Sequence, residues 1–182
     1  MRLENSFEVS ASPDAAWRLL NDVPRVIPCM PGASLDEVVD DDTFKLTMQV
    51  KLGPVELRFA AHVIRDGADE DGRRTTMAVK AREAKGRGAA SARIESTLEP
   101  AGEGTRVSIV TDLQLQGTIA TMGRGVVGPV AGQIVAQFAD CIAKQLQSPV
   151  AAPAEDVPAE VKPVGGFALL FRSFFGVFRR RR

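Results

Sequence analysis

The feature that most constrains this chain is a change in the spacing of its apolar residues near residue 118. From residue 33 to 117, apolar and polar residues alternate in runs that turn residues interrupt every 8–14 positions. Such alternation predicts antiparallel strands with one polar face. From residue 118 to 147, apolar residues recur at three- and four-residue steps, which is the period of an amphipathic helix. We therefore expect a curved antiparallel sheet followed by one long helix.

Two neighbouring runs define the register of the sheet most clearly, and the turn Gly53-Pro54 separates them. His62, the single histidine, stands out of phase with the apolar residues, so we expect it on the outer, solvated face. The residues expected on the inner face are Phe44, Leu46, Met48, Val50 and Leu52, then Val55, Leu57, Phe59, Ala61 and Val63.

The first third of the chain contains a strand and short helices. Residues 2–10 alternate imperfectly, as Leu3, Asn5, Phe7 and Val9, and are expected to form a strand. Ser12-Pro13-Asp14 begins a helix, because serine caps the first turn and proline is tolerated at its first position. Prolines then limit residues 24–32 to a short helical turn or a shaped loop. The expected order is β-α-α-β6-α, an α+β domain over residues 1–147.

Sequence motifs for catalysis are weak throughout the chain. No matched ligand spacing predicts a metal site, and no serine or cysteine stands in a nucleophile motif. The run Asp40-Asp41-Asp42 is expected to be solvated in a turn. Cys29 and Cys141 are far apart, and we expect two buried, reduced thiols of a cytosolic domain. We predict no catalytic residue, no metal and no enzymatic activity.

Residues 123–128 (GRGVVG) fit the G-x-G-x-x-G pattern of dinucleotide-binding loops. That pattern needs a βαβ unit and an acidic residue after a second parallel strand, and here only helix and linker are expected to follow. The glycines are therefore interpreted as loosening the start of the long helix or bringing it close to the sheet. The helix start and the turn at 24–32 are expected to flank the entrance to a pocket and to move without breaking the core.

The last 35 residues differ from the rest. Residues 148–166 hold four prolines and form a flexible linker. Residues 167–182 carry five of the nine phenylalanines and five arginines without an acid, whereas residues 1–147 carry 17 basic and 20 acidic residues. As a helix, residues 167–178 present a continuous apolar stripe about 18 Å long, too short to span a bilayer but suited to its surface.

We expect this tail to bind an anionic membrane surface, where basic residues are attracted to lipid phosphate. Docking on a partner protein or on the domain itself are the alternatives, and nucleic acid is disfavoured by the phenylalanines. No apolar stretch is expected to reach the length of a transmembrane helix, and Met1 is not followed by a secretory signal. The residues expected to bind the membrane are Phe167, Leu170, Phe171, Phe174, Phe175, Phe178, Arg179, Arg180, Arg181 and Arg182.

Several short segments over residues 1–147 resemble the carbon monoxide dehydrogenase CoxG family, which belongs to the helix-grip, START-like (SRPBCC) superfamily. The resemblance differs at Ala33, where many relatives have cysteine. The segments that carry it are Ala16-Trp17, Leu20-Asn21-Asp22, Cys29-Met30-Pro31-Gly32-Ala33, Leu52-Gly53-Pro54-Val55, Gly86-Arg87-Gly88 and Gln116-Gly117-Thr118-Ile119-Ala120-Thr121-Met122-Gly123, which leads into Phe138.

The resemblance implies a sheet gripping the long helix around an apolar cavity. It also implies a membrane-associated accessory role beside a molybdenum-containing carbon monoxide dehydrogenase, at the cytoplasmic face of the bacterial membrane, with a quinone as ligand and no covalent cofactor. Small residues in the sheet and flexible methionines favour a cavity independently. The residues expected to line it are Ile27, Met30, Met48, Phe59, Met77, Ile109, Leu113, Met122, Val126 and Val130.

Three functions stay open at this stage. The chain is a carrier of an apolar ligand, a scaffold that recruits the oxidoreductase without a ligand, or an enzyme of the same fold. The enzyme is disfavoured because no paired titratable groups are expected on inner faces. The first two functions differ in whether the cavity exists.

Overall fold

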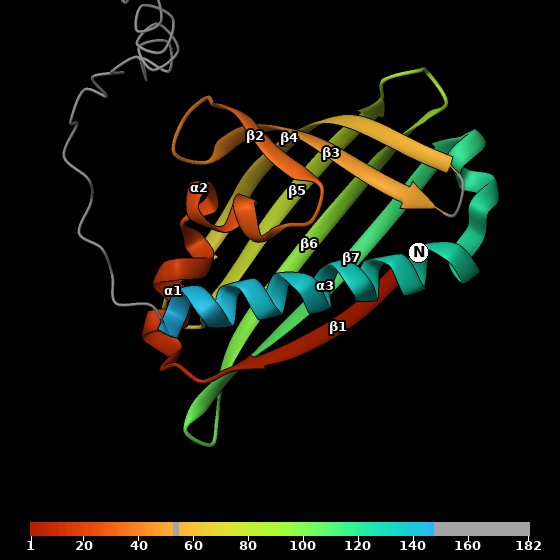
Figure 1. The fold of residues 1–182 in the computed structure, drawn as a ribbon. Coiled ribbons are helices and arrows are strands. Elements are labelled where there is room, and N and C mark those ends of the chain that lie inside the picture. Colours follow the sequence, from red (N-terminus) through yellow and green to blue (C-terminus); the bar gives the residue numbers. More distant parts are fainter. Residues whose placement is uncertain (53–54, 148–182) are drawn as a thin grey trace, which may run out of the picture. The chain divides into compact units, whose positions relative to one another are not determined.

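A single seven-stranded antiparallel sheet curves around one long helix, α3 (Figure 1). The computed structural model describes residues 1–52 and 55–147, so the predictions on the linker at 148–166 and the tail at 167–182 lie outside the described residues. The elements are β1 (Arg2–Val9), α1 (Pro13–Asn21), α2 (Val23–Val26), the 3-10 turn η1 (Ile27–Cys29), β2 (Ala33–Val38), β3 (Thr43–Leu52), β4 (Val55–Asp69), β5 (Arg74–Glu83), β6 (Gly88–Ala101), β7 (Gly104–Gly117), the 3-10 turn η2 (Thr118–Met122) and α3 (Gly123–Gln147).

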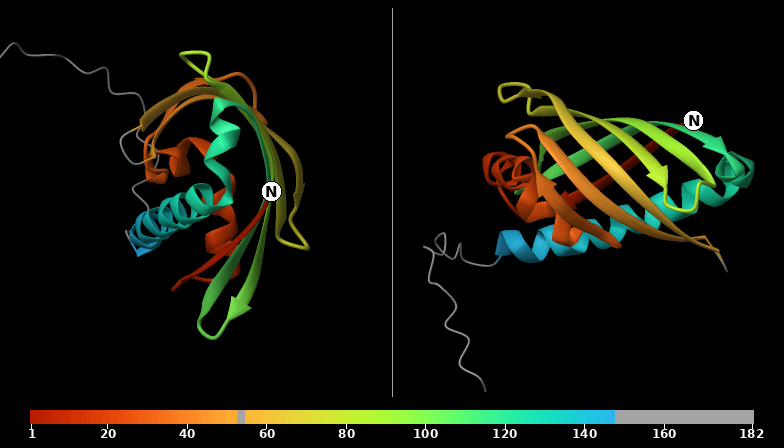
Figure 2. Two further views of the ribbon diagram at one scale, coloured as in Figure 1. Left: turned by 90° about the vertical axis from the view of Figure 1, so that its right-hand side faces the viewer. Right: turned by 90° about the horizontal axis from the view of Figure 1, so that it is seen from above.

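The strands are ordered β1-β7-β6-β5-β4-β3-β2, so the first strand pairs with the last. This closes the N-terminal strand onto the end of the meander and leaves β1 and β2 as edges. In Figure 2, α3 lies on the concave side of the sheet, with α1 and α2 near its C-terminal end. The predicted order β-α-α-β6-α and the α+β helix-grip architecture are confirmed.

The register of β3 and β4 follows the predicted inner and outer faces. Leu57, Phe59, Ala61 and Val63 are all buried, whereas His62 between them is exposed. β4 continues beyond the alternating run that ends at Val63, because a bulge between Arg65 and Gly67 carries the strand to Asp69. A bulge adds one residue and bends the strand, so pairing continues where alternation fails.

The apolar core is divided into three clusters along the concave side. The first joins Trp17 and Leu19 of α1 to β1, β7 and the C-terminal part of α3. The second places Val23 and Ile27 against β3 and β4, and the third gathers Leu57, Phe59 and Ile119 beside η2. The clusters lie at the ends of the sheet and beside α2, and less buried apolar residues connect them.

The α3 helix is longer and more apolar than any stretch expected from the sequence. Its residues Gly125–Gln147 are long and apolar enough to cross a bilayer by length and composition. The expectation that no apolar stretch reaches that length is therefore wrong. Phe138 and Ile142 of α3 pack into the first cluster, and 11% of the most apolar part of the helix is buried.

Cys29 of η1 and Cys141 of α3 form a disulfide, with their Cα atoms 5.3 Å apart. The prediction of two reduced thiols is therefore wrong. The error came from their separation of 112 residues, although Cys141 already stood on the apolar stripe of the helix. The fold brings the two residues together because η1 and α3 share one apolar cluster.

Candidate functional site

The concave face of the sheet between the three clusters is apolar but incompletely covered. Its central strands carry small side chains where a filled core would carry large ones, as at Ala81, Ala90 and Ala92. The side chains that keep solvent-accessible surface although they point toward α3 are Met48, Met77, Val79, Ala81, Ala90, Ala92, Ile94, Leu113 and Leu115. This face is the candidate site for an apolar ligand.

The residues predicted to line a cavity divide into three groups. Ile27 and Phe59 are buried within the second and third clusters, so they belong to the packed core rather than to an open wall. Val126 is 41% exposed, and the side chain of Met122 lies outside the described residues. The half-buried remainder is Met30, Met48, Met77, Ile109, Leu113 and Val130.

The N-terminal half of α3 lies over this face without being built into the core. None of residues 125–137 is buried. Cβ atoms added at Gly125 or Gly128 would meet no atom within 4 Å. Asn5 of β1 and Gly132 of α3 come close, because an added Cβ at Gly132 would stand 3.9 Å from Asn5 Oδ1. Gly125 and Gly128 therefore have open space beside them, whereas Gly132 brings the helix close to β1, as one of the two sequence interpretations proposed.

The turn at 24–32 was predicted to move at the entrance of the pocket, but it is packed into the core. Val23, Val26, Ile27 and Cys29 are all buried, and the disulfide ties η1 to α3. Gln145 of α3 also donates to the backbone carbonyl of Arg25 at 3.2 Å. This packing contradicts the expectation of a movable segment, because moving it would break two apolar clusters.

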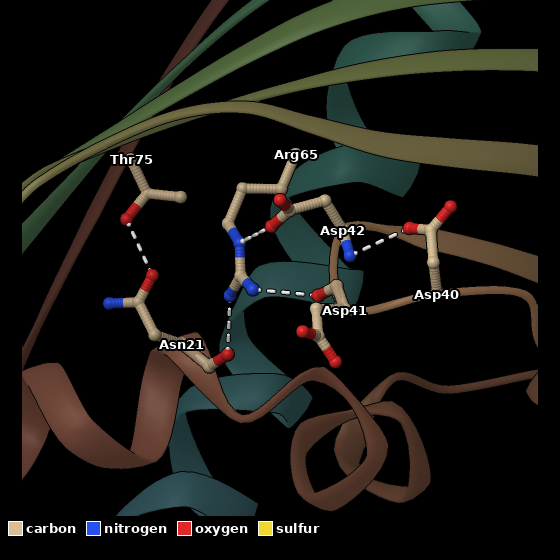
Figure 3. Close-up of polar contacts among 6 residues, drawn as sticks. All are labelled: Asn21, Asp40, Asp41, Asp42, Arg65 and Thr75. Atoms are coloured by element: carbon tan, nitrogen blue, oxygen red, sulfur yellow. Dashed lines mark hydrogen bonds and ion pairs between the residues drawn. The ribbon is translucent and has the colours of Figure 1, made fainter.

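A polar network centred on Arg65 holds Asn21, the last residue of α1 (Figure 3). The Arg65 guanidinium donates to the carbonyl oxygens of Asn21 and Asp41 and to Asp42 Oδ1, each at 2.8 Å. Thr75 Oγ1 donates to Asn21 Oδ1 at 2.9 Å. The acidic run is thus partly used for structure, joining the β2–β3 hairpin to the end of α1. Sequence reasoning missed this role of Arg65, which lies at the bulge.

A second ion pair closes the opposite end of the sheet. The Glu83 side chain is 1% exposed and accepts hydrogen bonds from Arg87 Nη2 at 2.9 Å and from the backbone N–H groups of Lys85 and Arg87. These bonds, led by that from Arg87, lower the pKa of Glu83 from 4.5 to about 2. The carbonyl of Arg87 accepts from Thr118 N, so the pair supports η2 and the start of α3.

His62 lies on the convex face, at a shallow depression of about 370 Å³ that Lys80, Arg82, Ser91 and Gln116 also line. No carboxylate lines this depression, so nothing in the described residues orients His62 for proton transfer. In residues 1–52 and 55–147, no three His, Cys, Asp or Glu side chains gather as metal ligands would. Among the described residues, this depression therefore offers cations but no acid–base pair.

A curved antiparallel sheet that grips a long C-terminal helix defines the α+β helix-grip class, and the concave face is where such a fold presents a site. The sequence profile of the carbon monoxide dehydrogenase CoxG family matches residues 6–147. The chain belongs to this family. The family description implies association with carbon monoxide dehydrogenase in an accessory role. No curated protein sequence matches the chain significantly.

Solved structures support the fold assignment. A conserved protein from Geobacillus kaustophilus is 22% identical with a TM-score of 0.71, covering 80% of this chain and 95% of its own. The Zhui aromatase/cyclase from Streptomyces sp. R1128 is 13% identical with a TM-score of 0.58, covering 86% and 99%. A truncated norcoclaurine synthase from Thalictrum flavum is 19% identical with a TM-score of 0.54, covering 82% and 95%. These likenesses show that the chain shares the helix-grip fold of these structures, and they concern the fold alone.

Proposed function

We propose that this chain is a non-catalytic carrier that takes an apolar ligand, a membrane quinone, from the bilayer and presents it to a carbon monoxide dehydrogenase-type oxidoreductase containing molybdenum. The observation that carries the proposal is the incomplete cover of the concave face. Apolar side chains that keep accessible surface beneath a helix are stabilised by an apolar guest, because burial of that surface is favourable.

The ligand is tested by thermal unfolding of the full chain with and without decylubiquinone. A ligand at one hundred times its dissociation constant adds about 2.7 kcal/mol to the free energy of unfolding, so the midpoint should rise by several degrees. Ala92→Phe, which adds a ring to the concave face, should abolish the rise. Ala60→Phe on the exposed convex face of β4 is the matched control and should keep it.

The alternative is a scaffold that recruits the oxidoreductase and holds no ligand. In that case the concave face is filled by its own side chains in solution. Ala92→Phe should then cost about 1–3 kcal/mol by overpacking, and the parent protein should show no shift with quinone. The two results together would reject the carrier and favour the scaffold.

The membrane part of the proposal rests on the sequence of residues 167–182. Five phenylalanines and a terminal run of four arginines suit the surface of an anionic bilayer. Removing residues 167–182 should abolish cosedimentation with phosphatidylglycerol vesicles. Replacing Arg179–Arg182 by serine should weaken it and reduce its salt dependence. Binding that is unchanged by the deletion would exclude the tail as the anchor.

The cytoplasmic face of the membrane is the proposed location. The disulfide removes one argument for it, the expectation of two reduced thiols. Disulfides persist in oxidising compartments and are rare in the cytosol. Alkylation of Cys29 and Cys141 in intact cells, before and after reduction, tests the location. Free thiols would support the cytoplasmic face, and a fully oxidised pair would favour an extracytoplasmic one.

A further inference from the structure

Three polar side chains occupy positions on the concave face where the neighbouring inward-facing residues are mostly apolar. Asn5 of β1 and Ser96 of β6 both pair with Ile109 of β7, one on each side. Thr111 follows Ile109 by two residues and therefore points to the same face. All three side chains are half-buried. They surround Ile109 on the part of the concave face that β1, β7 and β6 form, where α3 packs against β1.

These side chains lack the hydrogen bonds that other polar groups in the same layer make. The buried Thr75 donates to Asn21 Oδ1 at 2.9 Å, and the buried Thr105 donates to the carbonyl of Ala11 at 2.7 Å. Asn5, Ser96 and Thr111 have no side-chain partner anywhere in residues 1–52 and 55–147. Water can satisfy them while the face is open, but an apolar ligand that displaced this water would leave three donors unpaired.

The spacing of the three groups suits the polar head of a ligand. Asn5 and Ser96 lie two strands apart, roughly 10 Å, and Thr111 lies diagonally about 7–8 Å from each. A planar quinone ring, with a carbonyl oxygen on each side, fits between groups at this spacing. Gly132 of α3 approaches Asn5 and has no side chain, since a Cβ added there would stand 3.9 Å from Asn5 Oδ1.

The charge of the site distinguishes among lipids. The three groups are neutral donors, and a carboxylate or phosphate head would call for a cation instead. Arg65 pairs with Met77 and therefore lies on the same face of the sheet. Its guanidinium already makes three hydrogen bonds. A neutral acceptor is therefore preferred over an anion.

We propose that Asn5, Ser96 and Thr111 form the polar end of the ligand site, where they donate hydrogen bonds to the carbonyl oxygens of a quinone ring. Ala90, Ala92 and their apolar neighbours then hold the isoprenoid tail. The inference rests on the proposed carrier function and deepens it, because it names the chemical group that the site selects.

The test compares two probes on the full chain by calorimetry: decylubiquinone, which has carbonyl acceptors, and n-decylbenzene, which has none. The isosteric variants Thr111→Val, Asn5→Leu and Ser96→Ala should each weaken decylubiquinone binding about three- to tenfold, as loss of one neutral hydrogen bond does. Binding of n-decylbenzene should be unchanged or stronger. Ser6→Ala and Ser108→Ala, on the opposite face of the same strands, are the matched controls and should bind both probes as the parent does.

Infrared spectra of decylubiquinone labelled with ¹³C at its carbonyls give a readout that a purely structural role would not move. The carbonyl stretch should fall on binding to the parent and return toward its free frequency in Thr111→Val. Equal quinone affinity and an unchanged stretch in all three variants would overturn this inference while leaving the carrier function intact. Failure of the parent to bind either probe would instead overturn the carrier function itself.

Discussion

The two halves of α3 have the same helical geometry and opposite relations to the rest of the protein. In the C-terminal half, Phe138 and Ile142 are buried, and Cys141 is joined to Cys29. In the N-terminal half, no residue from 125 to 137 is buried. Only 11% of the most apolar part of the helix is buried. The helix is thus anchored at one end and lies over the concave face at the other.

The composition of the helix explains the difference. Gly125, Gly128 and Gly132 offer no side chain to bury, and Pro129 removes one backbone donor from the second turn. Large apolar residues of the helix are buried only from Phe138 onward. Local stability should therefore increase along the helix, and each prediction below tests that gradient.

The largest effect is expected at Ile142, which is 0% exposed. Ile142→Ala should lower the free energy of unfolding by about 2–5 kcal/mol, because it leaves a cavity in the first cluster. Ile134→Ala, two turns earlier and half-buried, is the matched control. It should cost clearly less in urea denaturation. Equal losses at the two positions would mean that the halves are equally packed.

Removing the disulfide should have the next largest effect. The double variant Cys29→Ala/Cys141→Ala should lose about 2–4 kcal/mol, since the unfolded chain is no longer cross-linked. Hydrogen exchange should accelerate most in the C-terminal half of α3 and in η1. If the acceleration were confined to residues 125–137, the anchor would lie elsewhere.

Stiffening the open half should raise stability by a smaller amount. Gly125→Ala and Gly128→Ala together should add about 1–2 kcal/mol, because alanine costs less entropy in a helix and its Cβ meets nothing here. The exchange rate of bound decylubiquinone should fall in the same variant when measured by stopped-flow. Lower stability would show that the glycines are needed for contacts of the helix backbone.

The last effect is confined to acid and absent at neutral pH, because it concerns the ion pair beneath η2. The pKa of Glu83 is lowered to about 2 in the folded protein from 4.5, so its stabilising contribution is complete above pH 4.5 and is lost as pH falls toward 2. Hydrogen exchange at pH 3 should open η2 and the start of α3 before the anchored end.

Glu83→Gln is the control for this assignment, because hydrogen bonds also lower the pKa values of Asp14 and Asp40. The variant should show a flatter loss of stability between pH 4.5 and 2 than the parent. Parallel pH profiles would assign the acid response to the aspartates.

Much of this fold was readable from the sequence because alternation directly encodes which side of a strand is buried. The inner faces of β3 and β4 were predicted residue by residue. The extension of β4 to Asp69 was not, since a bulge at Arg65 breaks the alternation. The disulfide was missed because its partners are distant in sequence and meet only through tertiary packing.

The candidate site was predicted less well than the fold. Apolar period alone selects residues that face inward, and it does not separate those that fill the core, such as Phe59, from those that keep accessible surface, such as Met48. The polar groups of the concave face were visible as exceptions. Asn5 made the first strand alternate imperfectly, and Thr111 stood in an otherwise apolar row. A polar residue in apolar phase was the available signal.

The covalent link at Cys141 has a mechanical consequence. As a pivot for α3 it would have a long arm, because the first residue of the helix lies 18 residues away, or roughly 27 Å along the axis. A tilt of about 10° around that pivot would carry the far end about 5 Å, while the residues beside the pivot barely moved. Leverage of this kind would enlarge the gap over Asn5 and Thr111 without unpacking Trp17 or Ile142.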